Sequence, residues 1–234
     1  MSRSSITAVV VVVPVHDEQA LLGRCLDSIA VAVAAVDLPT HVEVVMDACS
    51  DDSAVIAAGY PFAVSHIDAH LVGRARAHGV EAALAAHARV PERRVWIANT
   101  DADSVVPANW LTVQLELAKA GADVVIGTVR PEFDDLHPRH QQHWLSTHIP
   151  GQPNGHTHGA NLGIRASAYR AVGGFAELPE HEDVGLVQAC RHAGVAIAES
   201  DAAEVLTSGR TVGRTPGGYA GYLRAQAEML GAKR

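Results

Sequence analysis

Along the first 130 residues, apolar runs of strand length alternate with amphipathic segments of helical length. Residues 6–15 are almost continuously apolar and rich in β-branched side chains, which is typical of a strand buried on both faces. The same reasoning predicts further strands at 41–46, 62–67, 95–99 and 122–129, and helices at 19–36, 53–59, 73–88 and 109–120. This alternation predicts an α/β fold, with a mostly parallel sheet between two layers of helices.

Residues 130–161 break this rhythm, because they are polar, contain Pro and Gly and show little periodicity. A long irregular insert in a compact domain is usually functional or mobile, so we expect residues 131–158 to close over bound ligands as a lid. Order returns afterwards, and the pattern predicts helices at 183–193 and 219–232 and strands at 195–198 and 204–207. No linker or change in composition divides the 234 residues into two domains.

Composition narrows the class of protein. Hydrophobic residues make up 48% of the chain, which is enough for a packed core, and the net charge of −8 argues against a nucleic-acid binder. The three cysteines form no CxxC pair, as expected for reduced thiols in a cytoplasmic protein. The apolar run 6–15 is too short to cross a bilayer, so we expect no transmembrane segment. Nothing in the sequence fixes the oligomeric state, and a homodimer is compatible with it.

Acidic side chains follow three of the predicted strands. Glu18 follows the first strand, Asp47 the second, and Asp101 and Asp103 the fourth. In open parallel sheets, ligands bind outside the carboxyl ends of the strands, so these carboxylates are expected at one edge. Asp101 and Asp103 could hold a hard cation between them, or they could belong to an ordinary turn. No GxGxxG, P-loop or GxSxG motif is present, which argues against dinucleotide binding, a P-loop NTPase and an α/β-hydrolase.

Six segments together resemble the GT-A fold glycosyltransferases of family 2, the inverting nucleotide-sugar enzymes. The resemblance runs from about residue 8 to 195, and its segments occur in the family's order: VVVPVHDEQALLGRCLDSI, VVMDACSDDS, GRARAHG, TDADSVVPANWL, GANLGIRASAYRAVGGF and HEDVGL. It implies a single GT-A domain over 1–234, with a nucleotide-binding half at about 6–130 and an acceptor half at about 131–234. It also implies transfer of a hexosyl or related group from a nucleotide-diphosphate sugar to an acceptor that the sequence does not identify.

The resemblance assigns the nucleotide and the metal to the strand ends. Glu18 is expected near the ribose, Asp47 at the base edge, Val15 beside the nucleotide, and Arg76 near the base or the phosphates. Asp101 would face the ribose or the metal. Asp103 would bind Mg²⁺ or Mn²⁺, which suits carboxylate oxygens and offsets the charge of a diphosphate leaving group.

The catalytic base is expected in the segment HEDVGL. An inverting transfer needs a base for the acceptor hydroxyl, and the resemblance implies Asp183 for this role, with Glu182 as the alternative. Both residues also suit the start of a helix for electrostatic reasons alone. A retaining enzyme of the same fold, a non-catalytic nucleotide-sugar-binding module and a nucleotidyltransferase remain competing interpretations.

The remaining candidates lie in the second half of the chain. His158 and Asn161 are expected to line the acceptor pocket, and Arg210 and Arg214 either reach phosphate oxygens or are unpartnered surface residues.

Two departures from the family pattern stand out. Ala48 and Cys49 occupy a turn that is more polar or glycine-rich in many relatives. No histidine follows His192, so a C-terminal histidine ligand for the metal is not available. The six histidines between 137 and 158 lack the spacing of structural zinc sites and are interpreted as an acceptor loop.

Overall fold

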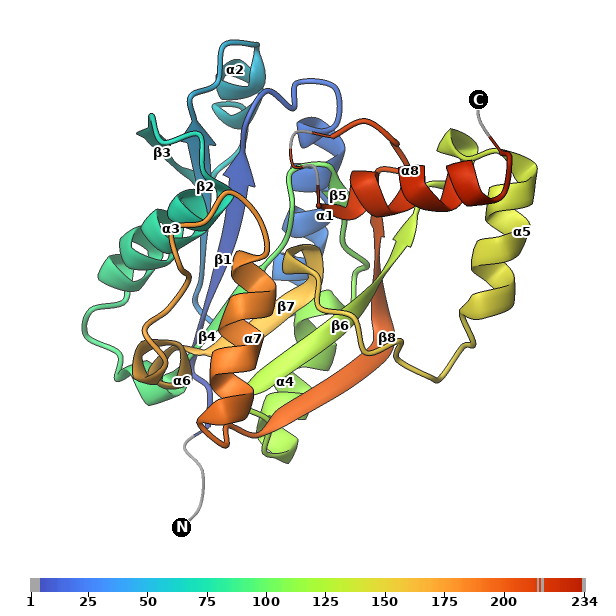
Figure 1. Ribbon diagram of the computed structural model, residues 1–234. Helices are drawn as coiled ribbons and strands as arrows, with labels where there is room; N and C mark the ends of the chain where they lie inside the picture. The colour runs from blue at the N-terminus through green and yellow to red at the C-terminus, as the bar shows by residue number, and fades with distance from the viewer. Residues whose placement is uncertain (1–4, 214, 216, 233–234) are drawn as a thin grey trace.

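An eight-stranded sheet, β3-β2-β1-β4-β7-β6-β8-β5, forms the centre of the computed structural model, which describes residues 5–213, 215 and 217–232 (Figure 1). Strands β1 to β4 are mutually parallel, β7 is antiparallel to its neighbours β4 and β6, and β8 is parallel to β6. The strands are β1 (Ala8–Val15), β2 (Thr40–Asp47), β3 (Ala63–Ile67), β4 (Val95–Asn99), β5 (Ser104–Val105), β6 (Val124–Pro131), β7 (Leu162–Arg165) and β8 (Ile197–Thr207).

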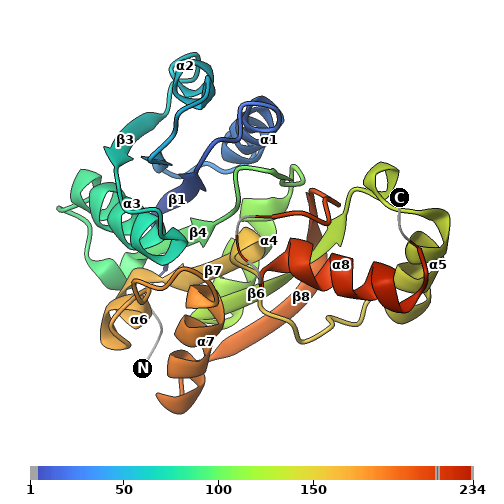
Figure 2. The ribbon, with the colours of Figure 1, turned by 45° about the horizontal axis from the view of Figure 1, so that its top comes forward.

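Helices cover both faces of this sheet, as Figure 2 shows. Helices α1 (Leu22–Ala34), α2 (Ser53–Ala57) and α4 (Trp110–Ala120) contribute to the core on one face. The opposite face is covered by α3 (Val72–Ala86), α6 (Ala166–Ala171) and α7 (Glu182–His192). Short 3₁₀ turns complete the description: η1 (Glu92–Arg94), η2 (Phe133–Asp135) and η3 (Gly159–Asn161). The predicted α/β sandwich is therefore confirmed.

Strand β1 explains why the first apolar run has no polar positions. Val9, Val11 and Val13 belong to the core on one face, and Val10 and Val12 belong to the core on the other. Successive side chains of a strand point to opposite faces, so a strand between two helix layers is apolar throughout. The expectation of parallel strands holds for β1 to β4, whereas β5 and β7 are antiparallel to their neighbours.

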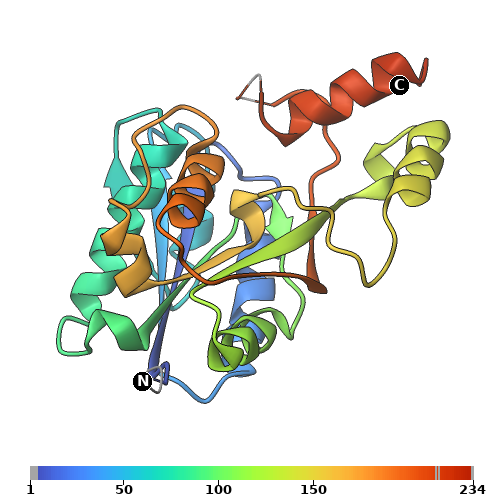
Figure 3. The same cartoon turned by 60° about the horizontal axis from the view of Figure 1, so that its bottom comes forward.

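A two-helix extension projects beyond the sheet and corrects the expectation of an irregular insert (Figure 3). Helix α5 (Pro138–Thr147) lies within the histidine-rich segment and is joined to α8 (Tyr219–Met229) by a 3.0 Å contact between His140 Nε2 and Gln226 Oε1. Proline stands at the first turn of α5, where its missing N–H costs nothing. This helix buries only His140 and Trp144, so the sequence offers no apolar periodicity from which to predict it.

The second half contains one further correction. The strands expected at 195–198 and 204–207 are one continuous strand, β8, whose polar middle is extended beside β6. The register in which β6 pairs with β8 shifts between Gly127 and Val129, and this shift accommodates the continuous strand. The two-residue strand β5 was not predicted, since two residues carry no measurable period. No helix among the described residues has both the length and the apolar character needed to cross a membrane.

Candidate active site

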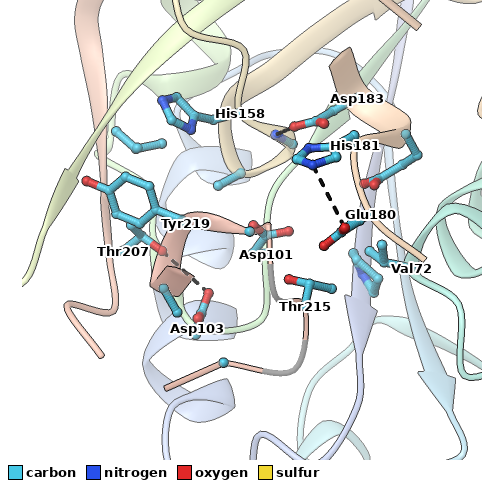
Figure 4. Close-up of a pocket in the computed structure, with 18 of the residues that line it drawn as sticks. Val72, Asp101, Asp103, His158, Glu180, His181, Asp183, Thr207, Thr215 and Tyr219 are labelled. Atoms are coloured by element: carbon cyan, nitrogen blue, oxygen red, sulfur yellow. Dashed lines mark hydrogen bonds and ion pairs between the residues drawn. The ribbon is translucent and has the colours of Figure 1, made fainter. Parts of the chain in front are cut away.

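A cavity of about 860 Å³ opens where the strands β1, β2 and β4 end. Its lining also comes from η3, the start of α7, the segment after β8 and the start of α8. Figure 4 shows side chains from both halves of the chain converging on it, with Asp101 near the centre, Asp183 above and Tyr219 to one side. The cavity thus lies at the carboxyl-end edge of the sheet, where the strand-end carboxylates predict a ligand site.

Arg210 lies between two of the predicted carboxylates. Its guanidinium donates to both oxygens of Glu18, at 2.7 and 3.1 Å, and its Nη2 lies 2.9 Å from Asp103 Oδ2. Burial lowers the pKa of Arg210, but the hydrogen bond to Glu18 and the charge of Asp103 raise it overall. Arg210 is therefore a partnered residue of the pocket and not an unpartnered surface arginine. Arg214 lies outside the described residues.

Asp103 is mostly enclosed, with 15% of its side chain exposed. Burial raises the pKa of its carboxyl, the charge of Asp101 raises it further, and Arg210 opposes both, so the pKa reaches about 6. A carboxylate with a raised pKa is destabilised as an anion and gains more than usual from a nearby cation. The site thus favours positive charge between the strand ends.

Arg76 contributes to the floor of the cavity, although only 1% of its surface is exposed. Its Nε donates to Glu182 Oε1 at 2.9 Å, and its Nη2 forms an ion pair with Asp101. Burial lowers the pKa of Arg76, but the charges of Asp101, Glu182 and Asp183 outweigh burial and raise it. Arg76 also lines the cavity, so its contact with a nucleotide stays a prediction, and its guanidinium is engaged by carboxylates from β4 and α7.

Asp183 faces the cavity from the first turn of α7. One carboxylate oxygen accepts the N–H of Gly159 at 2.6 Å, and the other accepts the N–H of Val184 at 2.7 Å. Burial raises the pKa of Asp183, and the charge of Arg76 and the two N–H groups offset only part of that rise. A fixed carboxylate with an elevated pKa is suited to accept a proton. The neighbouring Glu182 is 4% exposed and paired with Arg76.

Asp47 holds the turn after β3. Its carboxylate accepts the backbone N–H groups of Ala69, His70 and Leu71 at 2.7 to 2.9 Å, and both Asp47 and Val15 line the cavity. The contact of Asp47 with a base stays a prediction. In the structure, Asp47 also positions the backbone of the turn after β3.

Backbone strain concentrates around the cavity. The non-glycine residues with positive φ among those described are Asp17, Ala48, His70 and His181, and two of these, His70 and His181, line the cavity. Such conformations persist where the surrounding structure enforces them, and they cluster at functional sites. Ala48, noted above as a departure from the family pattern, thus adopts a conformation usually given to glycine.

The two acceptor candidates, His158 and Asn161, lie in different surroundings in the structure. His158 lines the cavity, and burial lowers the pKa of its imidazole to about 4. Asn161 is 2% exposed and spans β6, β8 and α4, with its amide donating to the carbonyls of Thr128 and Ala203 and accepting from Trp110. The ligand contact of Asn161 stays a prediction, and the structure shows its amide engaged in joining β6, β8 and α4.

A divalent cation fits this pocket only in part. No trio of His, Cys, Asp or Glu side chains within the described part of the chain is arranged to hold a metal by itself. However, Asp101 and Asp103 supply hard oxygen ligands, and the cationic Arg210 already lies against Asp103. Mg²⁺ commonly binds through one or two carboxylates together with phosphate oxygens and water, which is the arrangement these residues allow.

The sequence model of Glycosyl transferase family 2 matches residues 10–173, more than half of the chain. The chain belongs to glycosyl transferase family 2. This match confirms the resemblance drawn from the six sequence segments. Among curated proteins, no sequence matches the chain.

Solved structures place this family 2 chain in the GT-A fold. S. aureus TarS 1–349 in complex with UDP-GlcNAc has a TM-score of 0.64 and 16% identity, over 98% of this chain and 68% of that one. The mannosyltransferase PcManGT from Pyrobaculum calidifontis, in complex with GDP-Man and Mn²⁺, has a TM-score of 0.62 and 19% identity, over 98% and 64%. The glucosyl-3-phosphoglycerate synthase of Mycobacterium tuberculosis, in complex with phosphoglyceric acid, has a TM-score of 0.56 and 17% identity, over 100% and 83%.

The family 2 chain spans only part of the length of each of these relatives. It spans 60% of TarS 1–349 in the complex with UDP and 40% of a longer TarS structure. At these identities the likeness establishes the fold alone, and the roles of individual residues rest on the geometry described above.

Sequence reasoning missed part of the lining of this family 2 site. Tyr219 and Tyr222 lie in the cavity wall, although the sequence predicted only a terminal helix there. Their spacing of three residues places them on one helix face, which was the available signal. His70 and His181 were also missed, since a positive φ at a histidine is not readable from sequence.

Proposed function

We propose that this family 2 glycosyltransferase moves a hexosyl or related group from a nucleotide-diphosphate sugar to an acceptor hydroxyl, with a divalent cation and with inversion. The observation that carries the proposal is the meeting of Asp101, Asp103 and Asp183 in one cavity. A module that only binds nucleotide sugars needs the first two residues but not a fixed carboxylate with a raised pKa facing the same space.

The nucleotide is proposed to lie across the ends of β1, β2 and β4, within the half at about 6–130. Val15, Glu18 and Asp47 line this side of the cavity, and Asp101 marks its far limit. Relatives with this fold are bound to UDP, UDP-GlcNAc and GDP-Man, which supports a nucleotide sugar as donor. Arg76 serves by fixing Asp101 and Glu182 from below.

The diphosphate and its cation are proposed to lie beside Asp101, Asp103 and Arg210. Mg²⁺ or Mn²⁺ held by the two aspartates would stabilise negative charge on the leaving diphosphate. A Mn²⁺ ion is present in the complex of PcManGT with GDP-Man, which supports this assignment. The guanidinium of Arg210, which pairs with both Glu18 and Asp103, would add positive charge beside the phosphate oxygens.

Asp183 is proposed as the base, from the half at about 131–234. One of its carboxylate oxygens accepts the proton of the acceptor hydroxyl while that oxygen forms a bond to the anomeric carbon. The bond between the anomeric carbon and the diphosphate breaks on the opposite face, and its electron pair leaves with the nucleoside diphosphate. Inversion follows from this single displacement. Glu182, paired with Arg76 and almost fully buried, is proposed to anchor the helix start.

Donor binding tests the proposal first. Nucleoside diphosphates and their sugars, screened by thermal shift with and without Mn²⁺, should include ligands that raise the melting temperature only with the metal, because a ligand that binds the native state stabilises it. A screen in which no nucleotide shifts the transition would contradict the proposed donor. Nucleotide binding without any transfer would favour the non-catalytic module instead.

The role of Asp103 can be tested with the same ligands. In Asp103→Asn, we expect the gain in affinity that Mn²⁺ gives to a nucleoside diphosphate to be lost, since one of two carboxylate ligands becomes a neutral amide. Isothermal titration in Mn²⁺ and in EDTA measures this gain. Asp37→Asn, an exposed aspartate before β2, is the matched control and should behave as wild type. Equally tight binding by the wild-type protein in EDTA would contradict the metal assignment.

A further inference from the structure

One side of the cavity is built from four rings that the proposed reaction does not use. His156, His158, Tyr219 and Tyr222, here called the aromatic wall, all line the cavity. Each ring contacts the next in a closed circuit: His158 to Tyr219 at 5.5 Å between centroids, Tyr219 to Tyr222 at 5.9 Å, Tyr222 to His156 at 6.4 Å and His156 to His158 at 6.2 Å. Two segments more than 60 residues apart therefore form one continuous ring surface.

The aromatic wall adjoins the proposed base and not the nucleotide. His158 immediately precedes Gly159, whose N–H donates to Asp183 at 2.6 Å. Figure 4 shows His158 and Tyr219 on one side of Asp101, with Val72 and Glu180 on the other side. A molecule resting on the aromatic wall would thus have Asp183 within the same part of the cavity, and it would face the diphosphate site at Asp101 and Asp103.

His158 and Tyr219, two of the four rings of the aromatic wall, are uncharged at neutral pH. Burial lowers the pKa of His158 to about 4, so its imidazole is neutral at neutral pH. Burial also raises the pKa of Tyr219, which keeps its phenol protonated. The arginines that line the described part of the cavity are each held by a carboxylate: Arg76 by Glu182, Arg191 by Glu199 and Arg210 by Glu18. An anionic group on the aromatic wall would lose its hydration without gaining an unpaired cation.

We propose that the aromatic wall is the acceptor subsite and that the acceptor is an uncharged carbohydrate. This inference rests on the proposed function and adds a substrate class to it. The apolar C–H face of a sugar ring packs on the tyrosine faces, and its hydroxyls exchange hydrogen bonds with the neutral imidazole of His158 and the hydroxyl of Tyr222. Pockets lined by rings with a few placed polar groups hold small ligands in this manner. One hydroxyl then faces Asp183, the group that accepts its proton.

Ligand-observed saturation-transfer NMR and calorimetry test this inference with defined probes. The probes are the methyl glycosides of glucose, mannose and N-acetylglucosamine together with their 6-phosphates, each added to the full chain with Mn²⁺ and with or without a nucleoside diphosphate. At least one neutral glycoside is expected to bind and to bind more tightly than its phosphate. Tighter binding of the phosphates, or no binding of any neutral glycoside in either condition, would overturn the inference.

Variants of Tyr222 locate the subsite. Tyr222 is 41% exposed, so its replacement is compatible with folding. Tyr222→Ala should weaken binding of the neutral glycoside about tenfold, and Tyr222→Phe, which keeps the ring, should preserve most of it. Tyr60→Ala removes a ring elsewhere on the molecule and should leave glycoside binding unchanged. Unaltered glycoside binding in Tyr222→Ala would overturn the inference. If the wild-type protein bound no nucleoside diphosphate, the proposed function would be refuted instead. The two failures can be told apart because glycoside binding is also measured without nucleotide.

Discussion

Replacing Asp183 with asparagine is expected to lower the transfer rate by about 10²–10⁴-fold, the usual contribution of a positioned base. Donor affinity should change little, because the amide keeps the size of the carboxylate and can still accept a hydrogen bond from Gly159 or Val184. The measurement is the rate of nucleoside diphosphate release with donor and acceptor, compared with calorimetric donor affinity for both proteins.

This substitution also distinguishes catalysis from stabilisation of the helix start. Asp183 is the second residue of α7, so the loss of its charge removes a helix-dipole interaction of only about 0.3–1 kcal/mol, which a residue that merely stabilises α7 would tolerate. The melting temperature of Asp183→Asn should therefore stay close to wild type and serves as the control for folding. A transfer rate close to wild type would contradict the assignment, and would move the base role to Glu182 or favour a retaining mechanism.

Replacing Arg76 with methionine is expected to lower the free energy of unfolding by about 3–5 kcal/mol, the typical result of removing one partner from a buried ion pair. Arg76 is almost completely buried and pairs with Glu182 and Asp101, so the variant leaves Glu182 without its cation in a nearly water-free position. Urea denaturation followed by circular dichroism gives the change in free energy.

Arg74 provides the matched control from the same helix. It pairs with Glu177, but both side chains are more than half exposed, and exposed ion pairs contribute about 0–1 kcal/mol. Arg74→Met should therefore unfold at nearly the wild-type urea concentration. If Arg76→Met were as stable as Arg74→Met, the view of Arg76 as the anchor beneath Asp101 and Glu182 would be wrong.

The first half of the fold could be predicted from sequence because its patterns are local. Strand β1 is apolar at almost every position, and α1 repeats its apolar residues at helical spacing. Helix α5 could not be predicted, since its only buried residues are His140 and Trp144 and its packing depends on α8, about 80 residues away. Strand β8 was divided in two because its polar middle carries no strand signal.

The candidate site could be predicted in part. Asp101 and Asp103 were expected because they directly follow a strand, Asp183 was expected from the resemblance to family 2, and all three line the cavity. The burial of Arg76 could not be predicted, because its partner Glu182 is 106 residues away along the chain. The aromatic wall could not be predicted for the same reason, since contact between His158 and Tyr219 depends on how α8 returns over η3.

The most direct test of the proposed reaction is proton NMR of the transferred sugar. The protein is mixed with Mn²⁺, the nucleotide sugar selected by the thermal-shift screen and the glycoside that binds most tightly, and the anomeric signal of the product is followed from the first minutes. We predict a new glycoside whose anomeric configuration is opposite to that of the donor, with no product in EDTA or with Asp183→Asn. A product that retains the donor's configuration, or one that forms equally well in EDTA, would contradict the metal-dependent inverting mechanism.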